Sequence, residues 1–213
     1  MRIIMISGSP RDESRSLELL ERMKEYLPDD VTDVMQIREG ADLKTAAIKA
    51  SEYEAVILET PLYIDGLPSV FLRFLGQLEQ YAHGRIPVIA SVHCGFYEAD
   101  HCETALQIIE NWADHAGYIY KGGIGIGAAE ALPSLKAVKT GRGALRKIGQ
   151  GYEKITKALK QDRCENIYAS VSIPRFIYKA AVEAGWRRSI RKNGLEAKDL
   201  DNRMTDIRSR GRH

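Results

Sequence analysis

Hydroxyl and guanidinium side chains gather directly after the first apolar run of the chain. The run Ile3–Ile6 ends in Ser7-Gly8-Ser9-Pro10-Arg11, and Ser14 and Ser16 follow shortly before a segment of helical character. Serine hydroxyls and the free N–H groups at the start of a helix both favour a bound anion. Two acidic residues within the loop disfavour a polyphosphate, and neither the Walker A nor the G-x-G-x-x-G spacing is present. The segment therefore predicts either a site for one phosphate or a serine-capped helix without a ligand.

Two later loops carry aromatic side chains and glycines, again directly after apolar runs. One is Pro61-Leu62-Tyr63-Ile64-Asp65-Gly66-Leu67-Pro68, and the other is His93-Cys94-Gly95-Phe96-Tyr97-Glu98. Aromatic rings can border a flat ligand, and glycines allow the backbone to approach the polar edge of such a ligand. These two loops are therefore suited to a planar ring system.

The elements that must bring the three loops together are short strands that alternate with helical segments. The strand-like runs are 3–6, 31–37, 54–60, 86–92 and 118–127. This alternation predicts an α/β fold with a doubly wound, five-stranded parallel sheet in the order 2-1-3-4-5. Ligands of such sheets bind beyond the carboxyl ends of the strands, beside strand one. We therefore expect the loops after strands one, three and four to hold a ligand with one phosphate and a planar ring, and flavin mononucleotide (FMN) has this shape.

The three loops resemble those of the flavodoxin-like NAD(P)H-dependent FMN reductases and related quinone reductases. The matching motifs are Gly8-Ser9-Pro10-Arg11 with Ser14 and Ser16, Pro61–Pro68 and Cys94–Glu98, and the resemblance covers about residues 1–160. It implies an enzyme that passes hydride from NAD(P)H, as cosubstrate, to N5 of bound FMN. Electrons would then pass to a small-molecule acceptor, which is a quinone, a flavin or a similar compound.

The resemblance also implies which residues hold the cofactor. It places Ser9, Arg11, Ser14 and Ser16 around the phosphate, Pro61, Leu62, Tyr63 and Ile64 along the isoalloxazine ring, and His93, Cys94, Gly95 and Phe96 at the ring and ribityl side. No side chain is required as a nucleophile, because the reactive chemistry belongs to the cofactor. No catalytic side chain and no metal ligand is therefore expected.

Two other functions remain open at this point. The first is an FMN-binding electron-transfer carrier without its own nicotinamide oxidation. Such carriers are typically strongly acidic where they dock, and the net charge of +2 disfavours this alternative. The second is a flavin-free regulatory relative that has kept the fold, since fold does not determine function.

Two residues of the third loop invite a chemical role. His93 follows a central strand and is a candidate acid or base, although a loop hydrogen bond is the commoner use of a single histidine. Cys94 lacks a basic neighbour other than His93 and is expected to be a packed thiol. The acidic residues from Glu98 to Glu103 are typical of a helix start rather than of a metal site.

The composition excludes several classes of protein. The chain has 213 residues, of which 44% are hydrophobic and 28% charged, as in an ordinary globular protein. Its three cysteines form no C-x-x-C pair, so neither a disulfide framework nor a zinc or iron–sulfur cluster is indicated. The small net charge argues against a nucleic-acid partner. Without a signal peptide or a membrane-length apolar run, a cytoplasmic location is expected.

The carboxyl-terminal part has a different character. We expect a flavodoxin-like FMN-binding domain over residues 1–162 and a basic amphipathic helical extension over 163–213. In the extension, apolar side chains between Ile173 and Ala184 recur at helical spacing, and a basic run from Arg187 to Lys192 follows. Docking on the core or on a second subunit, in a homodimer or homotetramer, is favoured over contact with an anionic membrane surface.

Overall fold

The computed structural model describes residues 1–12, 14–81, 85–196 and 198–199. The charged stretch from Asp199 to His213 is expected to be loosely ordered, and its residues 200–213 lie outside the described residues. Two compact units divide the chain, Met1–Ser172 and Ile173–His213. The first unit contains the sheet and the helices that cover it.

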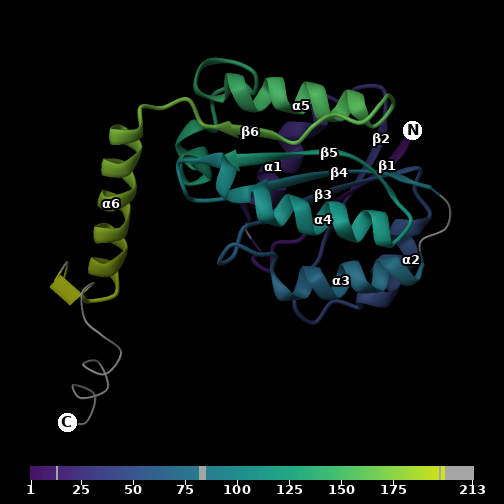
Figure 1. Cartoon of the computed structure of the whole chain (residues 1–213). Coiled ribbons are helices and arrows are strands. Elements are labelled where there is room, and N and C mark those ends of the chain that lie inside the picture. The colour runs from purple at the N-terminus through teal and green to yellow at the C-terminus, as the bar shows by residue number, and fades with distance from the viewer. Residues whose placement is uncertain (13, 82–84, 197, 200–213) are drawn as a thin grey trace, which may run out of the picture. The chain divides into compact units, whose positions relative to one another are not determined.

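A single parallel sheet with the order β2-β1-β3-β4-β5-β6 forms the centre of the first unit (Figure 1). Its strands are β1 (Arg2–Ser7), β2 (Val31–Gln36), β3 (Ala55–Pro61), β4 (Pro87–His93), β5 (Ile119–Gly127) and β6 (Ile167–Ser170). The described residues of β3 are all buried, as are those of β1 after its first residue. Such continuous burial is typical of parallel strands that have helices on both faces.

Helices cover the two faces of the sheet. They are α1 (Arg15–Lys24), α2 (Leu43–Ser51), α3 (Ser69–Gln80), α4 (Glu103–His115) and α5 (Arg146–Ala158), with 3-10 turns η1 (Ala99–Cys102), η2 (Ala129–Leu135) and η3 (Gly143–Leu145). Helices α2, α3 and α4 share one apolar core with alternate residues of β1, β3 and β4. Helices α1 and α5 pack on the opposite face (Figure 1).

The predicted sheet of five strands is corrected by β6. The order of the first five strands is as predicted, but Ile167–Ser170 adds a sixth strand parallel to β5. This strand has only four residues, so its side chains do not establish an alternating pattern, and it lies beyond the expected domain end at residue 162. The compact unit accordingly ends at Ser172.

The glycines of β5 allow neighbouring chain segments to approach closely. A Cβ atom on Gly125 would lie 2.8 Å from the Ala99 carbonyl oxygen, and one on Gly127 would lie 2.4 Å from that of Tyr97. The pairing of β4 with β5 also shifts register between Val88 and Ala90. The segment that follows β4 therefore lies directly against the end of β5.

The second unit contains one long helix, α6 (Arg175–Lys192). Gly194 follows the end of this helix with a positive φ of 73°, and a glycine in this conformation is typical of a helix stop. Large apolar side chains of α6 are exposed, with exposed fractions of 75% for Phe176 and 65% for Trp186. Among the described residues, no helix is long and apolar enough to cross a bilayer.

Candidate functional site

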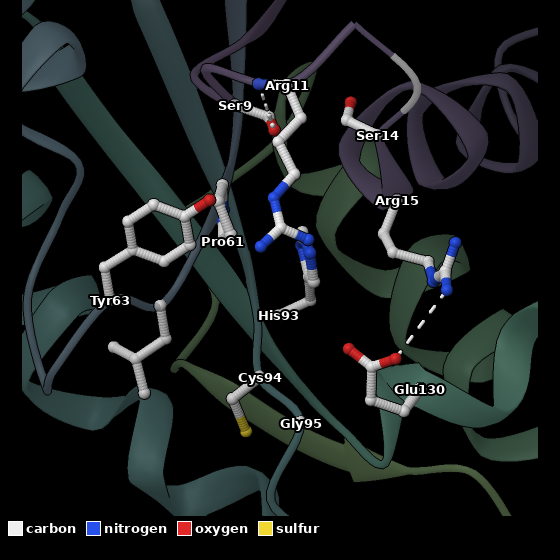
Figure 2. Close-up of a pocket in the computed structure, with 11 residues that line it drawn as sticks. Ser9, Arg11, Ser14, Arg15, Pro61, Tyr63, His93, Cys94, Gly95 and Glu130 are labelled. Carbon is white, nitrogen blue, oxygen red and sulfur yellow. Dashed lines mark hydrogen bonds and ion pairs between the residues drawn. The ribbon is translucent and has the colours of Figure 1, made fainter. Parts of the chain in front are cut away.

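The loops that follow β1, β3 and β4 meet around one cavity (Figure 2). The residues that line it are Ser9, Arg11, Ser14, Arg15, Pro61, Leu62, Tyr63, His93, Cys94, Gly95 and Glu130. The first ten come from the three loops that the sequence analysis singled out and from the first residue of α1. The parallel sheet therefore brings together the segments that were expected to meet.

The loop after β1 has serine hydroxyl groups that accept hydrogen bonds from backbone amides. Ser9 Oγ accepts a hydrogen bond from the Arg11 amide at 3.4 Å, and Ser14 Oγ caps α1 by accepting from the Leu17 amide at 3.3 Å. Each hydroxyl thus uses a lone pair within the loop and keeps its proton for another acceptor. The Gln36 side chain donates to the Ser9 carbonyl at 3.3 Å and also to that of Arg11. These bonds hold the loop in place, with the Ser9 and Ser14 hydroxyls in the lining of the cavity.

Arginines surround this loop, and one of them is incompletely paired. Arg15 forms an ion pair with Glu130 at 3.7 Å (Figure 2), and its Nε atom is buried without a hydrogen-bond partner among the described residues. Asp12, one of the acidic residues of the loop, pairs with Arg38. Arg11 lines the cavity beside Ser9. The cavity end near α1 is therefore able to balance the charge of an anion.

Gly8 is required by the packing of the loop on α3. A Cβ atom at this position would lie 2.5 Å from the ring of Phe71, which is fully buried. The Gly8 amide also donates to the Glu59 carbonyl at 2.7 Å, which continues the strand pairing by one residue. The turn from β1 into the loop therefore depends on the absence of a side chain at Gly8.

The loop after β3 begins with a tight turn. The Tyr63 and Gly66 backbones exchange hydrogen bonds at 2.9 and 3.0 Å, and Ile64 and Asp65 between them have positive φ angles of 48° and 57°. A β-branched residue rarely adopts this conformation, and the Ile64 side chain is fully exposed. The turn presents Tyr63, which is 38% exposed, at the rim of the cavity.

Some residues of the loop after β4 line the cavity, and others lie at the surface. His93, Cys94 and Gly95 line the cavity, whereas the Phe96 ring packs on the His101 ring with centroids 4.4 Å apart. The Cys94 thiol hydrogen-bonds with that of Cys102, and this contact lowers the pKa of Cys94 although burial opposes the effect. The Cys94 thiol also donates to the Phe96 carbonyl at 3.7 Å.

Three of the residues predicted to hold the cofactor lie outside the lining of the cavity. They are Ser16, Ile64 and Phe96. Ser16 lies in the first turn of α1, where its Oγ atom is buried without a partner among the described residues. The other nine predicted residues line the cavity, together with Arg15 and Glu130. Glu130 belongs to η2 and was not among the predicted residues.

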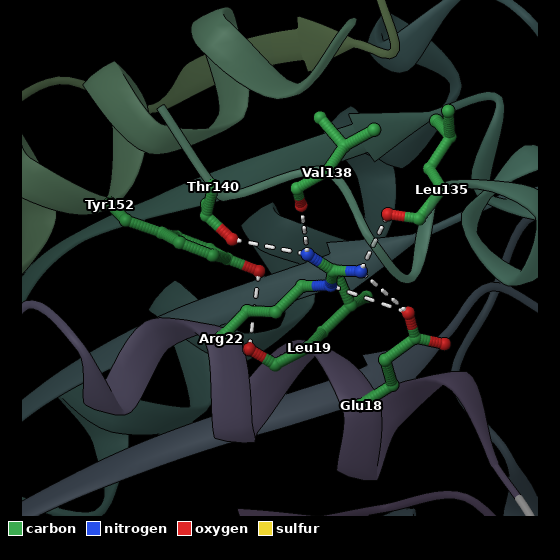
Figure 3. Close-up of polar contacts among 7 residues, drawn as sticks. All are labelled: Glu18, Leu19, Arg22, Leu135, Val138, Thr140 and Tyr152. Atoms are coloured by element: carbon green, nitrogen blue, oxygen red, sulfur yellow. Dashed lines mark hydrogen bonds and ion pairs between the residues drawn. The ribbon is translucent and has the colours of Figure 1, made fainter. Parts of the chain in front are cut away.

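Arg22 holds the segment that carries Glu130 (Figure 3). Its guanidinium donates to the Leu135 and Val138 carbonyls at 3.2 and 3.1 Å, to Thr140 Oγ1 at 3.3 Å and to the Glu18 carboxylate at 3.1 Å. The bonds to Leu135, Val138 and Thr140 join α1 to the end of η2 and to the chain that follows it. Arg22 and Arg15 therefore attach both ends of η2 to the helix that begins at the anion loop.

A buried acid–histidine pair lies beneath the cavity and was not predicted. Oε1 of Glu59, in β3, lies 2.7 Å from Nδ1 of His93, and the carboxyl is fully buried. Burial raises the pKa of Glu59, and the contact with His93 partly opposes this rise. The signal in the sequence was a carboxylate directly after the apolar run Ala55–Leu58. Among the described residues, no three metal-ligating side chains gather in one place.

The sequence matches one protein-family model over more than half of its length. The family model of NADPH-dependent FMN reductases matches residues 1–129. The chain belongs to this family. It is an NAD(P)H-dependent flavin oxidoreductase with FMN as its cofactor. No curated protein matches the sequence.

Solved structures share the fold of this family member at low sequence identity. A flavone reductase matches with a TM-score of 0.56 and 15% identity, over 78% of this chain and 66% of that chain. An oxidoreductase from Corynebacterium diphtheriae matches with a TM-score of 0.53 and 12% identity, over 76% and 98%. General stress protein 14 from Treponema denticola, in complex with FMN, matches with a TM-score of 0.51 and 14% identity, over 75% and 97%. These matches confirm the flavodoxin-like α/β fold.

Proposed function

We propose that the cavity binds FMN with its phosphate at the loop after β1 and its ring between the loops after β3 and β4. The observation that carries this proposal is that the two ends of one cavity are lined by different kinds of chemical group. Ser9, Arg11, Ser14 and Arg15 supply hydroxyl and guanidinium donors at one end. The segments Pro61–Tyr63 and His93–Gly95 supply aromatic and apolar side chains and backbone groups at the other end.

The donors present fit a phosphate monoester. The Ser9 and Ser14 hydroxyls accept from backbone amides and retain their own protons for an incoming oxygen. Within the part of the chain that the structure describes, the buried Arg15 Nε atom has no hydrogen-bond partner, which is costly unless a ligand accepts from it. Glu130 is the acidic group in the lining, and it pairs with Arg15. The site therefore offers more positive than negative charge to a phosphate.

We further propose that the enzyme transfers hydride from NAD(P)H to FMN and passes electrons to a quinone, a flavin or a similar planar acceptor. Bound FMN would supply the redox chemistry, since it takes hydride at N5 and gives up electrons to a second substrate. The role of the chain is to bind and orient. One structural relative is a flavone reductase, and an aromatic carbonyl compound is consistent with the tyrosine at the cavity rim.

The test is an anaerobic visible spectrum of the FMN-reconstituted protein before and after addition of NADH or NADPH. We expect the absorbance of bound FMN to bleach, and to return when a quinone is added. Flavin that stays bound and oxidised would instead indicate an electron carrier. If FMN does not bind, the assignment of the cavity is wrong.

The cellular context of the enzyme is also a proposal. The three cysteines are unpaired, which suits a compartment that keeps thiols reduced. A nicotinamide reductant is consistent with the same setting. These features support a cytoplasmic location. We propose that the protein forms a homodimer or homotetramer, and that contact of the second unit with a membrane surface is not its main role.

A further inference from the structure

Glu59 is an unusual residue for its position. It lies in β3, whose other residues are uncharged and all buried, and its neighbours across the sheet are Ser7 in β1 and Ser91 in β4. Its side chain is fully buried, and its Oε2 atom has no hydrogen-bond partner among the described residues. A buried carboxyl with an unpaired oxygen destabilises a fold unless it is compensated. Its presence in a central strand therefore points to a function.

The contact with His93 determines which ring nitrogen is available to a ligand. Glu59 Oε1 lies 2.7 Å from Nδ1, so the pair holds one proton between these two atoms. Nε2 is then the nitrogen through which His93 can bond to a molecule in the cavity that it lines. The His93 side chain is 8% exposed, which leaves it at the boundary between the sheet and the cavity.

The buried position of the pair favours a second proton within the pair as a whole. With one shared proton the pair carries a net negative charge, and with a further proton on Nε2 it is neutral. A low-dielectric interior penalises the net charge more strongly than the neutral arrangement, and two such groups titrate as one unit. The raised pKa of Glu59 has the same cause.

Other titratable groups surround the pair on several elements. Those that face it are Arg11 and Arg15 from the anion loop and α1, Glu130 from η2, Cys94 after β4, Cys102 from η1 and Tyr152 from α5. The two arginines disfavour further positive charge on the pair, and Glu130 offsets one of them through its ion pair. The pKa of Tyr152 is raised by burial and then by Glu59, so this hydroxyl stays neutral.

We propose that Glu59 and His93 act as one proton-holding pair, in which the buried carboxyl keeps a proton on His93 Nε2 and so presents a hydrogen-bond donor to the ring of the bound cofactor. Glu59 is the positioning residue, and His93 is the group that faces the ligand. The pair would favour the reduced, more negative cofactor over the oxidised one. This inference rests on the proposed FMN site, and it adds a function for two residues that binding alone does not require.

The first test reads the proton directly in the apoprotein. Long-range proton–nitrogen NMR of the histidine rings, followed against pH, compares the wild-type chain with Glu59→Gln, whose amide can still accept from Nδ1. We expect the midpoint at which His93 Nε2 loses its proton to fall by about one unit or more in Glu59→Gln. His115→Gln is the matched control, because His115 is an exposed histidine paired with Glu79 at 3.5 Å. An unchanged midpoint would overturn the proposal.

The second test measures cofactor binding without NAD(P)H. Dissociation constants of oxidised FMN and of photoreduced FMN are compared for the wild-type chain, Glu59→Gln, His93→Gln and His115→Gln. We expect the preference for reduced FMN to fall about tenfold or more in the first two variants, which corresponds to about 1.4 kcal/mol, and to stay unchanged in His115→Gln. Equal preferences in all four proteins would show that the pair only fills the core.

The two tests separate this inference from the proposed function. If photoreduced FMN shows the expected preference while NADH and NADPH fail to bleach the flavin, the reductase assignment is wrong and the inference stands. If NAD(P)H bleaches the flavin but Glu59→Gln leaves both readouts unchanged, the reductase stands and the inference is wrong. If neither form of FMN binds, the proposed site and the inference both fail.

Discussion

At the scale of single residues, the anion end of the cavity depends on side chains that serve the loop and the ligand together. Ser9 and Ser14 hold backbone amides with their lone pairs, so their protons remain available. This double use of a hydroxyl cannot be predicted from the sequence, because the sequence shows the serines but not the amides that donate hydrogen bonds to them. The guanidinium groups of Arg11 and Arg15 add positive charge at this end of the cavity.

Arg11 provides the clearest test at this scale. Arg11→Ala removes a guanidinium that lines the cavity beside Ser9, and charge-assisted bonds of this kind contribute about 1.5–3 kcal/mol. We expect the dissociation constant of FMN, measured by quenching of flavin fluorescence, to rise about 10- to 100-fold. The matched control is Arg73→Ala, which removes an exposed arginine that pairs with Glu39. Similar affinities in the two variants would contradict the assignment of the phosphate end.

At the scale of elements, the site exists because β1 turns into its loop against α3. The ring of Phe71 occupies the space that a side chain on Gly8 would need, at 2.5 Å from the ideal Cβ position. The requirement is one of packing between a strand end and a helix that are far apart in the sequence. It also explains why the loop starts with a glycine although its φ is not positive.

Gly8→Ala tests this packing. We expect the free energy of unfolding to fall by about 1–3 kcal/mol, because Phe71 must leave its rotamer or the strand must shift. The measurement is urea denaturation of the apoprotein. Gly76→Ala is the control: Gly76 lies within α3, and a Cβ atom there has nothing within 4 Å, so this change should stabilise by about 0.5–1 kcal/mol. If Gly8→Ala were equally harmless, the close approach would not constrain the loop.

The arrangement of the elements also explains which parts of the fold and of the site could be predicted from the sequence. Continuous apolar strands and the loops after them were enough to predict the order of the first five strands and the meeting of three loops, because parallel sheets place all carboxyl ends at one edge. The strand Ile167–Ser170 was missed because four residues carry too little pattern. Glu130 and Glu59 were missed because their roles depend on long-range partners, Arg15 and His93. The place of Phe96 beside the cofactor stays a prediction, and in the structure its ring packs on His101.

At the scale of the whole molecule, the two units differ in charge. Residues 173–213 contain eleven Lys or Arg and five Asp or Glu, a net charge of +6, and the total of +2 leaves −4 for residues 1–172. Helix α6 exposes Phe176 and Trp186, and a helix of 18 residues gains little stability without packing of an apolar face. Opposite charges on the two units favour contact between copies of the chain.

We therefore expect α6 to contribute to assembly of the proposed homo-oligomer. In the full chain, Phe176→Glu with Trp186→Glu places two acidic groups on this helix and should lower the oligomeric mass measured by sedimentation equilibrium, while FMN binding by the first unit persists. Leu72→Glu is the control, because Leu72 is an exposed apolar residue of α3 in the first unit, with an exposed fraction of 45%. Assembly that is lost in the control but kept in the α6 variant would place the interface on the first unit. A wild-type chain that is monomeric at all concentrations and binds anionic vesicles would show instead that the basic helix faces a membrane surface, because the same charges and aromatic side chains suit an anionic lipid headgroup.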